Sequence, residues 1–390
     1  MKIVIVTPTF YPDVNGASYF AQRLAHYLNK RGHSILVVAP SRSAKHESYD
    51  SKGVSVFGIR SFPIFINGFR VAQPIFVKNA LRKKIKEFSP DVVHLQSHLI
   101  FNKAAMEIAR ELGVPVIGTN HFMPENLVHF LHLPKKAEQY VKRLAWNDFL
   151  RVFEKVDAVT TPTQIGANLL TKIGLSKTIT PLSCGIDLDI FHPRNDGEYL
   201  REKYNLPGKT LMLYLGRLDK EKNIHVLLEA FAVALKKADA HFVISGLGAE
   251  EKKLKKLVAK LGIEKAVTFI FISDADKPSL YSLADCFAIA GIAELQSIVT
   301  MEAMASGHPI IAVDAMALPH LVKHEENGFL FQLDDTKSIA EYMVRIFSDL
   351  DLRKKMSEKS LELIQKHDIN RIMEGYEAIY KEAQETHKNK

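Results

Sequence analysis

Short apolar runs alternate with helical patterns along the whole chain, and this alternation limits its fold more than any other feature. The first repeat holds an apolar run at 2–8, a loop with Asn15 and Gly16, a helix over 18–30, and an apolar run at 34–40. Near-continuous apolar strands between helices are typical of a parallel sheet covered on both faces. The sequence therefore predicts an α/β protein. Further strands are expected at 54–59, 91–95, 114–120 and 157–163.

The same alternation starts again near residue 209. It predicts a second doubly wound domain, with strands at 210–216, 241–248, 266–272, 286–291 and 308–315. We expect an N-terminal Rossmann-like domain over 1–190, a C-terminal one over 191–368, and a final helix, about 369–390, that returns to the first domain. In such sheets ligands bind beyond the carboxyl ends of the strands, so two facing domains would place the site in a cleft between them.

Composition narrows the setting of the protein. With 390 residues and 47% hydrophobic residues, the chain is long enough for two cores. Its two cysteines, Cys184 and Cys286, suggest neither a disulfide framework nor a zinc site, so we expect a reducing cytoplasm. The sequence shows no secretory signal and no apolar run long enough to span a bilayer. It does not indicate an oligomeric state.

Positive charge is concentrated in the first half. Residues 1–190 hold 24 Lys and Arg against 14 Asp and Glu, a net charge of +10, whereas residues 191–390 hold 28 against 30, a net charge of −2. An excess of this kind suits an anionic surface, either acidic lipid or nucleic acid. Nothing in the sequence resembles a recognition helix or a base-stacking sheet, so we expect no nucleic-acid partner.

The segment 291–307, GIAELQSIVTMEAMASG, is the strongest candidate for the active site. It carries Glu294 in a loop and Glu302 in a short helix over 297–306, with Ser297 as a plausible N-cap and Gly307 as the stop. The free amides at a helix N-terminus favour a phosphate. Carboxylates accept hydrogen bonds from hydroxyl groups, so the pair indicates a ligand with both phosphate and sugar.

Several motifs together resemble the retaining glycosyltransferases of family four. They are LYLGRLDKEKN at 213–223, SGLGAE at 245–250 and the glutamate-bearing block at 293–315, and weaker matches lie at 7–18, 119–125 and 183–191. The resemblance implies the fold called GT-B, in which two Rossmann-like domains face each other. It implies hexose transfer from a nucleoside diphosphate sugar, with UDP-glucose expected first and GDP-mannose second.

The resemblance also implies roles for the candidate residues. Arg217 and Lys222 would clamp the diphosphate, which suits a forked guanidinium and a point charge. Glu302 would hold the ribose, and Glu294 the donor sugar. The nucleotide-sugar site would further include Gly216, Gly246, Ile272, Ser297, Ile298 and Val299.

Two further candidates lie in the first half. The resemblance implies that His121, after the strand at 114–120, contacts the donor sugar. Gly16 lies in the first strand–helix loop, where a missing side chain lets the backbone approach a phosphate. For both residues a purely structural role is nearly as plausible.

We expect transfer without a metal or other cofactor. Asp187 and Asp189 spell the DxD pattern of another glycosyltransferase architecture, but here they lie in the linker between the domains. His94 and His98 belong to a strand that runs into a loop, which makes a metal pair improbable. The leaving phosphate would itself help to deprotonate the incoming hydroxyl, because no nucleophile and acid pair of the glycosidase kind is evident.

The chain departs from the family pattern at three places. Ser297 stands where a glycine is common, Ile270 and Phe271 where the loop usually has glycine, and His320 where a glutamate is usual. These differences affect the base contact and the identity of the sugar more than the class of reaction.

The acceptor is predicted to be a lipid. The segments 61–88 and 129–152 mix aromatic residues, among them the sole tryptophan, Trp146, with many basic ones. This pattern suits an anionic membrane surface and resembles the diacylglycerol glucosyltransferases and phosphatidylinositol mannosyltransferases of the family. The expected function is glucose or mannose transfer to a lipid such as diacylglycerol at the inner face of the membrane.

Three other interpretations stay open, and a fourth is disfavoured. The basic segments are also typical of amphipathic helices that pack on the first domain with solvated outer faces. The acceptor could be a soluble sugar or small molecule, or the chain could bind a nucleotide sugar without turnover. A dinucleotide-dependent oxidoreductase or epimerase is disfavoured, since no GxGxxG follows the first strand.

Overall fold

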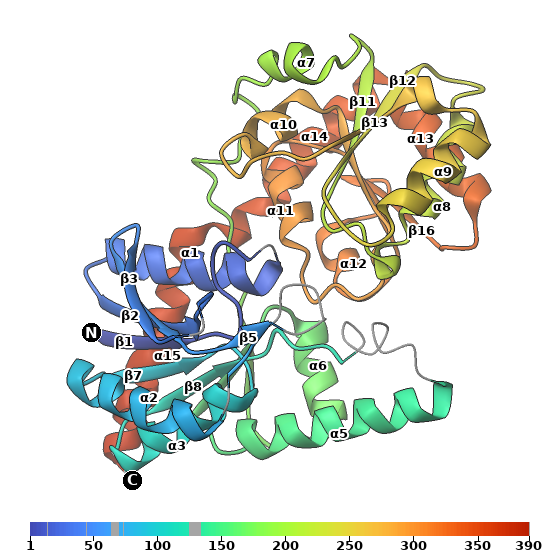
Figure 1. Cartoon of the computed structure of the whole chain (residues 1–390). Coiled ribbons are helices and arrows are strands. Elements are labelled where there is room, and N and C mark those ends of the chain that lie inside the picture. Colours follow the sequence, from blue (N-terminus) through green and yellow to red (C-terminus); the bar gives the residue numbers. More distant parts are fainter. Residues whose placement is uncertain (14, 44, 64–69, 73, 125–133, 390) are drawn as a thin grey trace. The chain divides into compact units, whose positions relative to one another are not determined.

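The computed structural model describes residues 1–390 except 14, 44, 64–69, 73, 125–133 and 390. The chain divides into two compact units. Unit 1 comprises Met1–Cys184 and Asn370–Lys390, and unit 2 comprises Gly185–Ile369. Each unit is an α/β domain built on one mainly or fully parallel sheet, as the alternation of apolar runs predicts (Figure 1).

Unit 1 is built on an eight-stranded sheet with the order β10-β9-β8-β7-β1-β2-β4-β3, in which only the edge strand β3 is antiparallel. A separate hairpin, β5–β6, was not predicted. The strands are β1 (Lys2–Val6), β2 (Ser34–Pro40), β3 (Glu47–Ser51), β4 (Val54–Ile59), β5 (Phe62–Pro63), β6 (Arg70–Val71), β7 (Val92–Leu95), β8 (Val116–Thr119), β9 (Ala158–Thr161) and β10 (Ile179–Pro181). The helices are α1 (Gly16–Lys30), α2 (Pro74–Phe88), α3 (Ile100–Glu111), α5 (Lys135–Phe153), α6 (Gln164–Lys172) and α15 (Ile369–Lys388).

The last helix, α15, packs on the sheet of unit 1. Its Tyr376 and Tyr380 side chains are fully buried, and the Tyr380 hydroxyl lies 2.8 Å from Nδ1 of His94. At the edge of this contact Arg31 donates from Nε and Nη2 to the two carboxylate oxygens of Glu377, at 2.9 and 3.0 Å. The C-terminal segment therefore completes a core that the first part of the chain leaves open.

Unit 2 is built on a six-stranded, fully parallel sheet with the order β13-β12-β11-β14-β15-β16. The chain moves outward from β11 in one direction and then returns to β14 on its other side. The strands are β11 (Thr210–Leu215), β12 (Ala240–Ser245), β13 (Val267–Ile270), β14 (Cys286–Ile289), β15 (Ile310–Val313) and β16 (Gly328–Phe331). The α-helices are α7 (Tyr199–Tyr204), α8 (Ile224–Ala234), α9 (Glu251–Leu261), α10 (Lys277–Leu283), α11 (Ile298–Ala305), α12 (Leu318–Leu321), α13 (Thr336–Ser348) and α14 (Leu350–Ile364), with 3-10 turns at η2 (Lys220–Lys222), η3 (Glu264–Ala266) and η4 (Gln365–His367).

Candidate active site

The strand order of unit 2 reverses between β11 and β14, and ligands of open α/β sheets bind beside such a reversal. The loops that follow these two strands carry Lys222 and Glu294. Nζ of Lys222 lies 2.6 Å from Oε1 of Glu294, and the two side chains are only 16% and 15% exposed. Gly291 makes room for them, because a Cβ there would lie 2.9 Å from the Glu294 carboxylate. Tertiary structure thus joins two candidates that are 72 residues apart.

Arg217 is held by two carboxylates that sequence reasoning did not assign. Its Nη1 pairs with Asp219, and its Nη2 donates to Oε1 of Glu221 at 2.7 Å. Both acids lie in the same DKEK stretch as Lys222, so their alternation with basic residues was the available signal. The Arg217 side chain as a whole keeps 28% exposure, so it is not closed off from a further anion.

Gly216 and Gly246 bring two strand ends unusually close. They follow β11 and β12 directly and adopt φ values of +153° and +151°. A Cβ on Gly246 would lie 1.8 Å from the carbonyl oxygen of Gly216, so no side chain fits between them. This edge of the sheet therefore offers backbone to a ligand.

Helix α11 begins immediately after the Glu294 loop. Its N-cap residue, Ser297, has φ +69°, a left-handed conformation that favours glycine. The predicted cap is wrong in detail, because the Ser297 hydroxyl lies 2.8 Å from the Thr300 hydroxyl and makes no cap bond to the helix backbone. The first turn, with Ile298 and Val299, directs its amide groups out of the helix start.

Glu302 lies on the buried side of α11. It is 6% exposed, and its Oε2 accepts a hydrogen bond from the Tyr281 hydroxyl at 3.1 Å. The same hydroxyl lies 3.1 Å from the carbonyl oxygen of Val299. Tyr281 comes from α10, and no sequence signal pointed to it. It orients the carboxylate and ties it to the first turn of α11.

A second tyrosine supports the loop that carries Arg217. The Tyr214 hydroxyl donates to the Arg217 carbonyl at 2.8 Å. Burial raises the pKa of Tyr214 well above its ordinary value, so the hydroxyl stays protonated and keeps donating.

The other assigned residues are placed as follows. Ile272, just beyond β13, is 5% exposed, so its side chain belongs to the core of unit 2. Gly16 and His121 belong to unit 1. Gly16 is exposed at the start of α1, where Asn15 caps the helix by accepting from the Ser18 N–H at 2.9 Å.

His121 follows β8 and packs against α1. Its ring centroid lies 4.7 Å from that of Phe20. Burial lowers the pKa of His121 to about 3, so the imidazole is neutral near pH 7. Its Nε2 has no hydrogen-bond partner within the described part of the chain.

The Asp187 side chain of the DxD pattern forms hydrogen bonds with nearby backbone N–H groups. Its Oδ1 accepts from the N–H groups of Asp189 and Ile190, at 2.9 and 3.1 Å. Across the described residues, no group of three or more His, Cys, Asp and Glu side chains is arranged to hold a metal ion.

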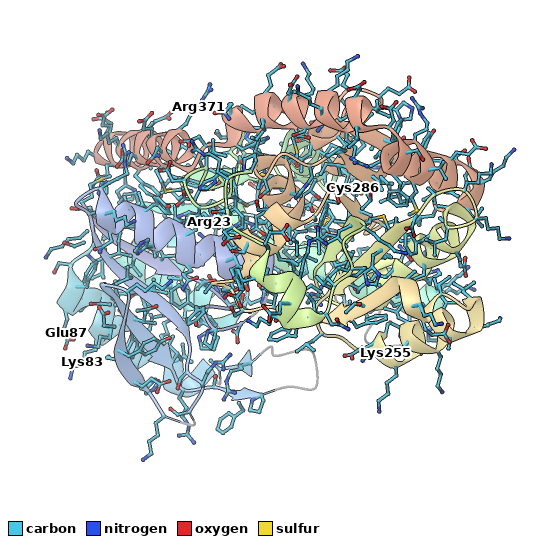
Figure 2. The ribbon with its side chains drawn as sticks, turned by 90° about the horizontal axis from the view of Figure 1, so that it is seen from above. Arg23, Lys83, Glu87, Lys255, Cys286 and Arg371 are labelled. Carbon is cyan, nitrogen blue, oxygen red and sulfur yellow. The ribbon has the colours of Figure 1, made fainter. Side chains whose placement is uncertain are left out.

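The basic segments of unit 1, 61–88 and 129–152, include most of helices α2 and α5. Val77, Leu81 and Ile85 of α2 enter the core. Side chains on the outer surface pair locally: Lys78 with Glu107 at 3.0 Å, Arg82 with Glu111, and Lys83 with Glu87 at 3.9 Å. Figure 2 shows Lys83 and Glu87 together at the edge of the molecule. Parts of both segments, 64–69, 73 and 129–133, lie outside the described residues.

Trp146, the sole tryptophan of the basic segments, lies in α5. It is only partly exposed, and its ring packs edge-on against Phe122 and Phe149, with centroids 5.6 and 5.5 Å away. The first half of α5 is more open, with Tyr140 and Leu144 56% and 48% exposed. Among the helices that the structure describes, none has the length and apolarity to cross a membrane.

Two family models together match most of the chain. The model described as Glycosyltransferase Family 4 matches residues 14–190, and the one described as Glycosyl transferases group 1 matches residues 196–362. The chain belongs to the glycosyltransferases of family four. This confirms the resemblance that the motifs indicated.

Curated relatives agree with this membership. An alpha-monoglucosyldiacylglycerol synthase of Streptococcus pneumoniae is 29% identical over 388 residues, covering 96% of this chain and 85% of the relative. A GDP-mannose-dependent alpha-mannosyltransferase of Mycolicibacterium smegmatis is 28% identical over 342 residues, covering 86% of this chain and 85% of the relative.

Solved structures share the fold of this glycosyltransferase. A sucrose-phosphate synthase from Thermosynechococcus elongatus superposes with a TM-score of 0.80 at 18% identity, covering 98% of both chains. The Anabaena protein HepE, in complex with UDP-glucose, gives 0.76 at 18% identity, covering 98% of this chain and 100% of that one. The predicted GT-B class with two Rossmann-like domains is therefore confirmed.

Proposed function

We propose that this glycosyltransferase moves a hexose, glucose or mannose, from a nucleoside diphosphate sugar to a lipid such as diacylglycerol at the inner face of the membrane. It does so with retention of configuration and without a metal ion. The observation that carries the proposal is the Lys222–Glu294 pair, which lies at the strand reversal of unit 2 just before the start of α11.

The donor half follows from the chemistry of the site. When the bond from the anomeric carbon to the phosphate oxygen breaks, negative charge grows on the diphosphate. Lys222, Arg217 and the first amides of α11 supply positive charge for it. Glu294 accepts hydrogen bonds from the sugar hydroxyls, and Glu302, oriented by Tyr281, accepts them from the ribose.

Retention follows if the acceptor hydroxyl attacks from the side that the diphosphate leaves. The new bond joins the acceptor oxygen to the anomeric carbon, and the hydroxyl proton passes to the departing phosphate oxygen. The pairing of the cations with carboxylates favours a metal-free site, because Lys222 and Arg217 are already fixed where a metal would otherwise neutralise charge.

The lipid half rests on the relatives and on unit 1. The Streptococcus pneumoniae relative is named a synthase of a glucosylated diacylglycerol, and the chain aligns with it over 388 residues. In α5 the exposed Tyr140 and Leu144 lie beside Lys136 and Arg143, a mixture that suits the boundary of an anionic bilayer.

The test is incubation with UDP-glucose or GDP-mannose, with and without vesicles of anionic phospholipid that contain diacylglycerol. We expect release of the nucleoside diphosphate and a glycolipid that keeps the α configuration, unaffected by EDTA. Arg217→Ala and Glu302→Ala should abolish transfer. Arg345→Ala, which breaks an exposed ion pair with Glu325, is the matched control. Transfer only to soluble sugars, with no vesicle binding, would refute the lipid half, and binding without turnover would refute the enzyme half.

A further inference from the structure

A pocket of about 360 Å³ lies in unit 1, where α2, α3 and α5 meet the loop after β7. Its volume falls within the roughly 300–1,000 Å³ range of small-molecule sites. His98 comes from the β7 loop, Lys78 from α2, and Asp148 from α5, whereas α3 contributes Lys103 and Glu107. The donor site in unit 2 uses none of these residues.

Three buried side chains with unpaired polar atoms follow β7 along the chain, and one of them, His98, lines the pocket. His98, which lines the pocket, is 3% exposed, and its Nδ1 has no hydrogen-bond partner among the described residues. Asn102, in the first turn of α3, is fully buried with both amide atoms unpaired in the same part of the chain. The carbonyl oxygen of the Gln96 side chain is a further unpaired atom. Buried polar atoms are costly without hydrogen bonds, so the unpaired nitrogen of His98, the one of these residues that lines the pocket, indicates a polar ligand.

The charged side chains around the pocket indicate the chemical class of this ligand. Lys78 pairs with Glu107 at 3.0 Å, and Lys103 and Asp148 add one further charge of each sign. A phosphate would face two carboxylates, and a cation would face two lysines. Hydroxyl groups both donate and accept, so a neutral polyhydroxylated molecule matches all four charges and the imidazole of His98.

The imidazole itself is neutral in the folded protein. Burial lowers the pKa of His98 to about 4, and the nearby Asp148 carboxylate opposes this only weakly. At neutral pH one ring nitrogen donates and the other accepts, which again suits a hydroxyl group.

The loop that lines the pocket lies close to the segment with His121, the residue of unit 1 that is predicted to contact the donor sugar. The strand order of unit 1 reverses between β1 and β7, and the loop that bears His98 follows β7. Phe122, the residue after His121, packs edge-on against the His98 ring with centroids 4.6 Å apart. His98 of the pocket therefore contacts the residue that directly follows His121 in the chain.

We propose that this pocket binds the head group of the acceptor, and that this head group is a sugar or polyol with several hydroxyl groups. The proposal rests on the proposed function and deepens its acceptor half. It predicts that an acceptor lipid with a glycosyl or polyol head group is used better than plain diacylglycerol.

The sole tryptophan offers a direct readout of binding. Trp146 contacts Phe122 and Phe149, and both of these rings also contact His98. We would titrate the full chain with methyl α-D-glucopyranoside and follow the emission of Trp146. His98→Phe removes the polar atoms while keeping an aromatic ring against its neighbours. Lys103→Ala removes an exposed cation of the pocket, and Lys172→Ala, an exposed lysine of α6 outside the pocket, is its control.

We expect a saturable change in emission that needs at least ten times more glucoside in His98→Phe and in Lys103→Ala, and an unchanged curve in Lys172→Ala. In transfer assays, Lys103→Ala should raise the KM for a glucosylated lipid and leave the KM for the nucleotide sugar unchanged. A melting curve shows whether His98→Phe is folded. If His98→Phe is not folded, Lys103→Ala still tests the proposal, because Lys103 is exposed.

The two proposals fail in different ways. If nucleotide sugar is turned over but the glucoside gives no saturable signal, or one that both pocket variants keep, the pocket holds water only and this inference is overturned. If the glucoside binds as expected but no nucleotide sugar is ever turned over, the proposed function fails and the pocket remains a sugar site.

Discussion

Replacing Gly246 by alanine tests whether the donor site depends on the close approach of two strand ends. A Cβ at this position would lie 1.8 Å from the Gly216 carbonyl oxygen, and contacts below 3.0 Å do not occur for real Cβ atoms. The two backbones must therefore separate by about 1.2 Å. That movement strains the bonds from the Gly216 N–H to the Ser245 carbonyl and from the Leu218 N–H to the Leu247 carbonyl, now 3.0 and 2.9 Å.

The expected cost follows from these contacts. Two weakened hydrogen bonds cost about 1 kcal/mol each, and the overpacking adds about 1 to 3 kcal/mol, so unit 2 should lose roughly 3 to 5 kcal/mol. For a domain of this size that is a fall in Tm of about 6 to 20 °C. Because Arg217 follows Gly216 directly, a displacement of about 1 Å should also lower the transfer rate by about 100-fold.

Gly262→Ala is the matched control in the same unit. Gly262 ends α9 with φ +68°, and a Cβ there would have no neighbour within 4 Å, so only the left-handed backbone is penalised. That costs about 1 kcal/mol. Thermal melts and titration with UDP or GDP measure both variants. If Gly246→Ala melts within about 2 °C of Gly262→Ala and binds the nucleotide equally well, the reasoning from backbone contact is refuted.

Three further changes probe other contacts. Lys222→Met removes the partner of Glu294 and should slow transfer by about 100- to 1,000-fold with the protein still folded. A smaller effect in a steady-state assay would refute the role of Lys222 in clamping the diphosphate. Tyr281→Phe takes one hydrogen bond from Glu302, so the KM for the donor should rise about 5- to 10-fold at nearly constant kcat, and an unchanged KM would contradict this orienting role. The pKa of Glu377 is lowered to about 2, chiefly by the hydrogen bond from the Arg31 guanidinium. Glu377 therefore contributes about 1 to 3 kcal/mol to the free energy of unfolding. This contribution is complete above pH 4.5 and is lost as the pH falls toward 2. Melts of Glu377→Gln should show a deficit against the wild type that shrinks below pH 4.5, and a constant deficit would disprove the linkage.

Buried strands were readable from the sequence where their residues are apolar. All eleven predicted runs became strands, with ends that moved by a few residues. Most of the strands that were missed are polar or very short, such as β3, with the sequence ESYDS, and the three-residue β10, but the apolar edge strand β16, with the sequence GFLF, was missed as well. They form at sheet edges, where only one side pairs, so their residues carry little periodic signal.

The candidate site was predictable in kind but not in detail. Arg217, Lys222, Glu294 and Glu302 were assigned from motifs, and their roles stay predictions. The partners that fix them, such as Asp219 and Tyr281, became evident only in three dimensions. The packing of Trp146 was not readable either, since it depends on Phe122, which lies elsewhere in the chain.

By itself the sequence determined what depends on neighbouring residues: the alternation of strands and helices, the two series of strands, and the motifs that mark the family. Those features arise because a residue's periodic position decides which face it buries. The tertiary structure decided which charges meet. Lys222 reaches Glu294 only because β14 returns to lie beside β11, and Glu302 reaches Tyr281 only because α10 packs against α11. Such contacts join residues far apart along the chain, and no local pattern specifies the order in which strands pair.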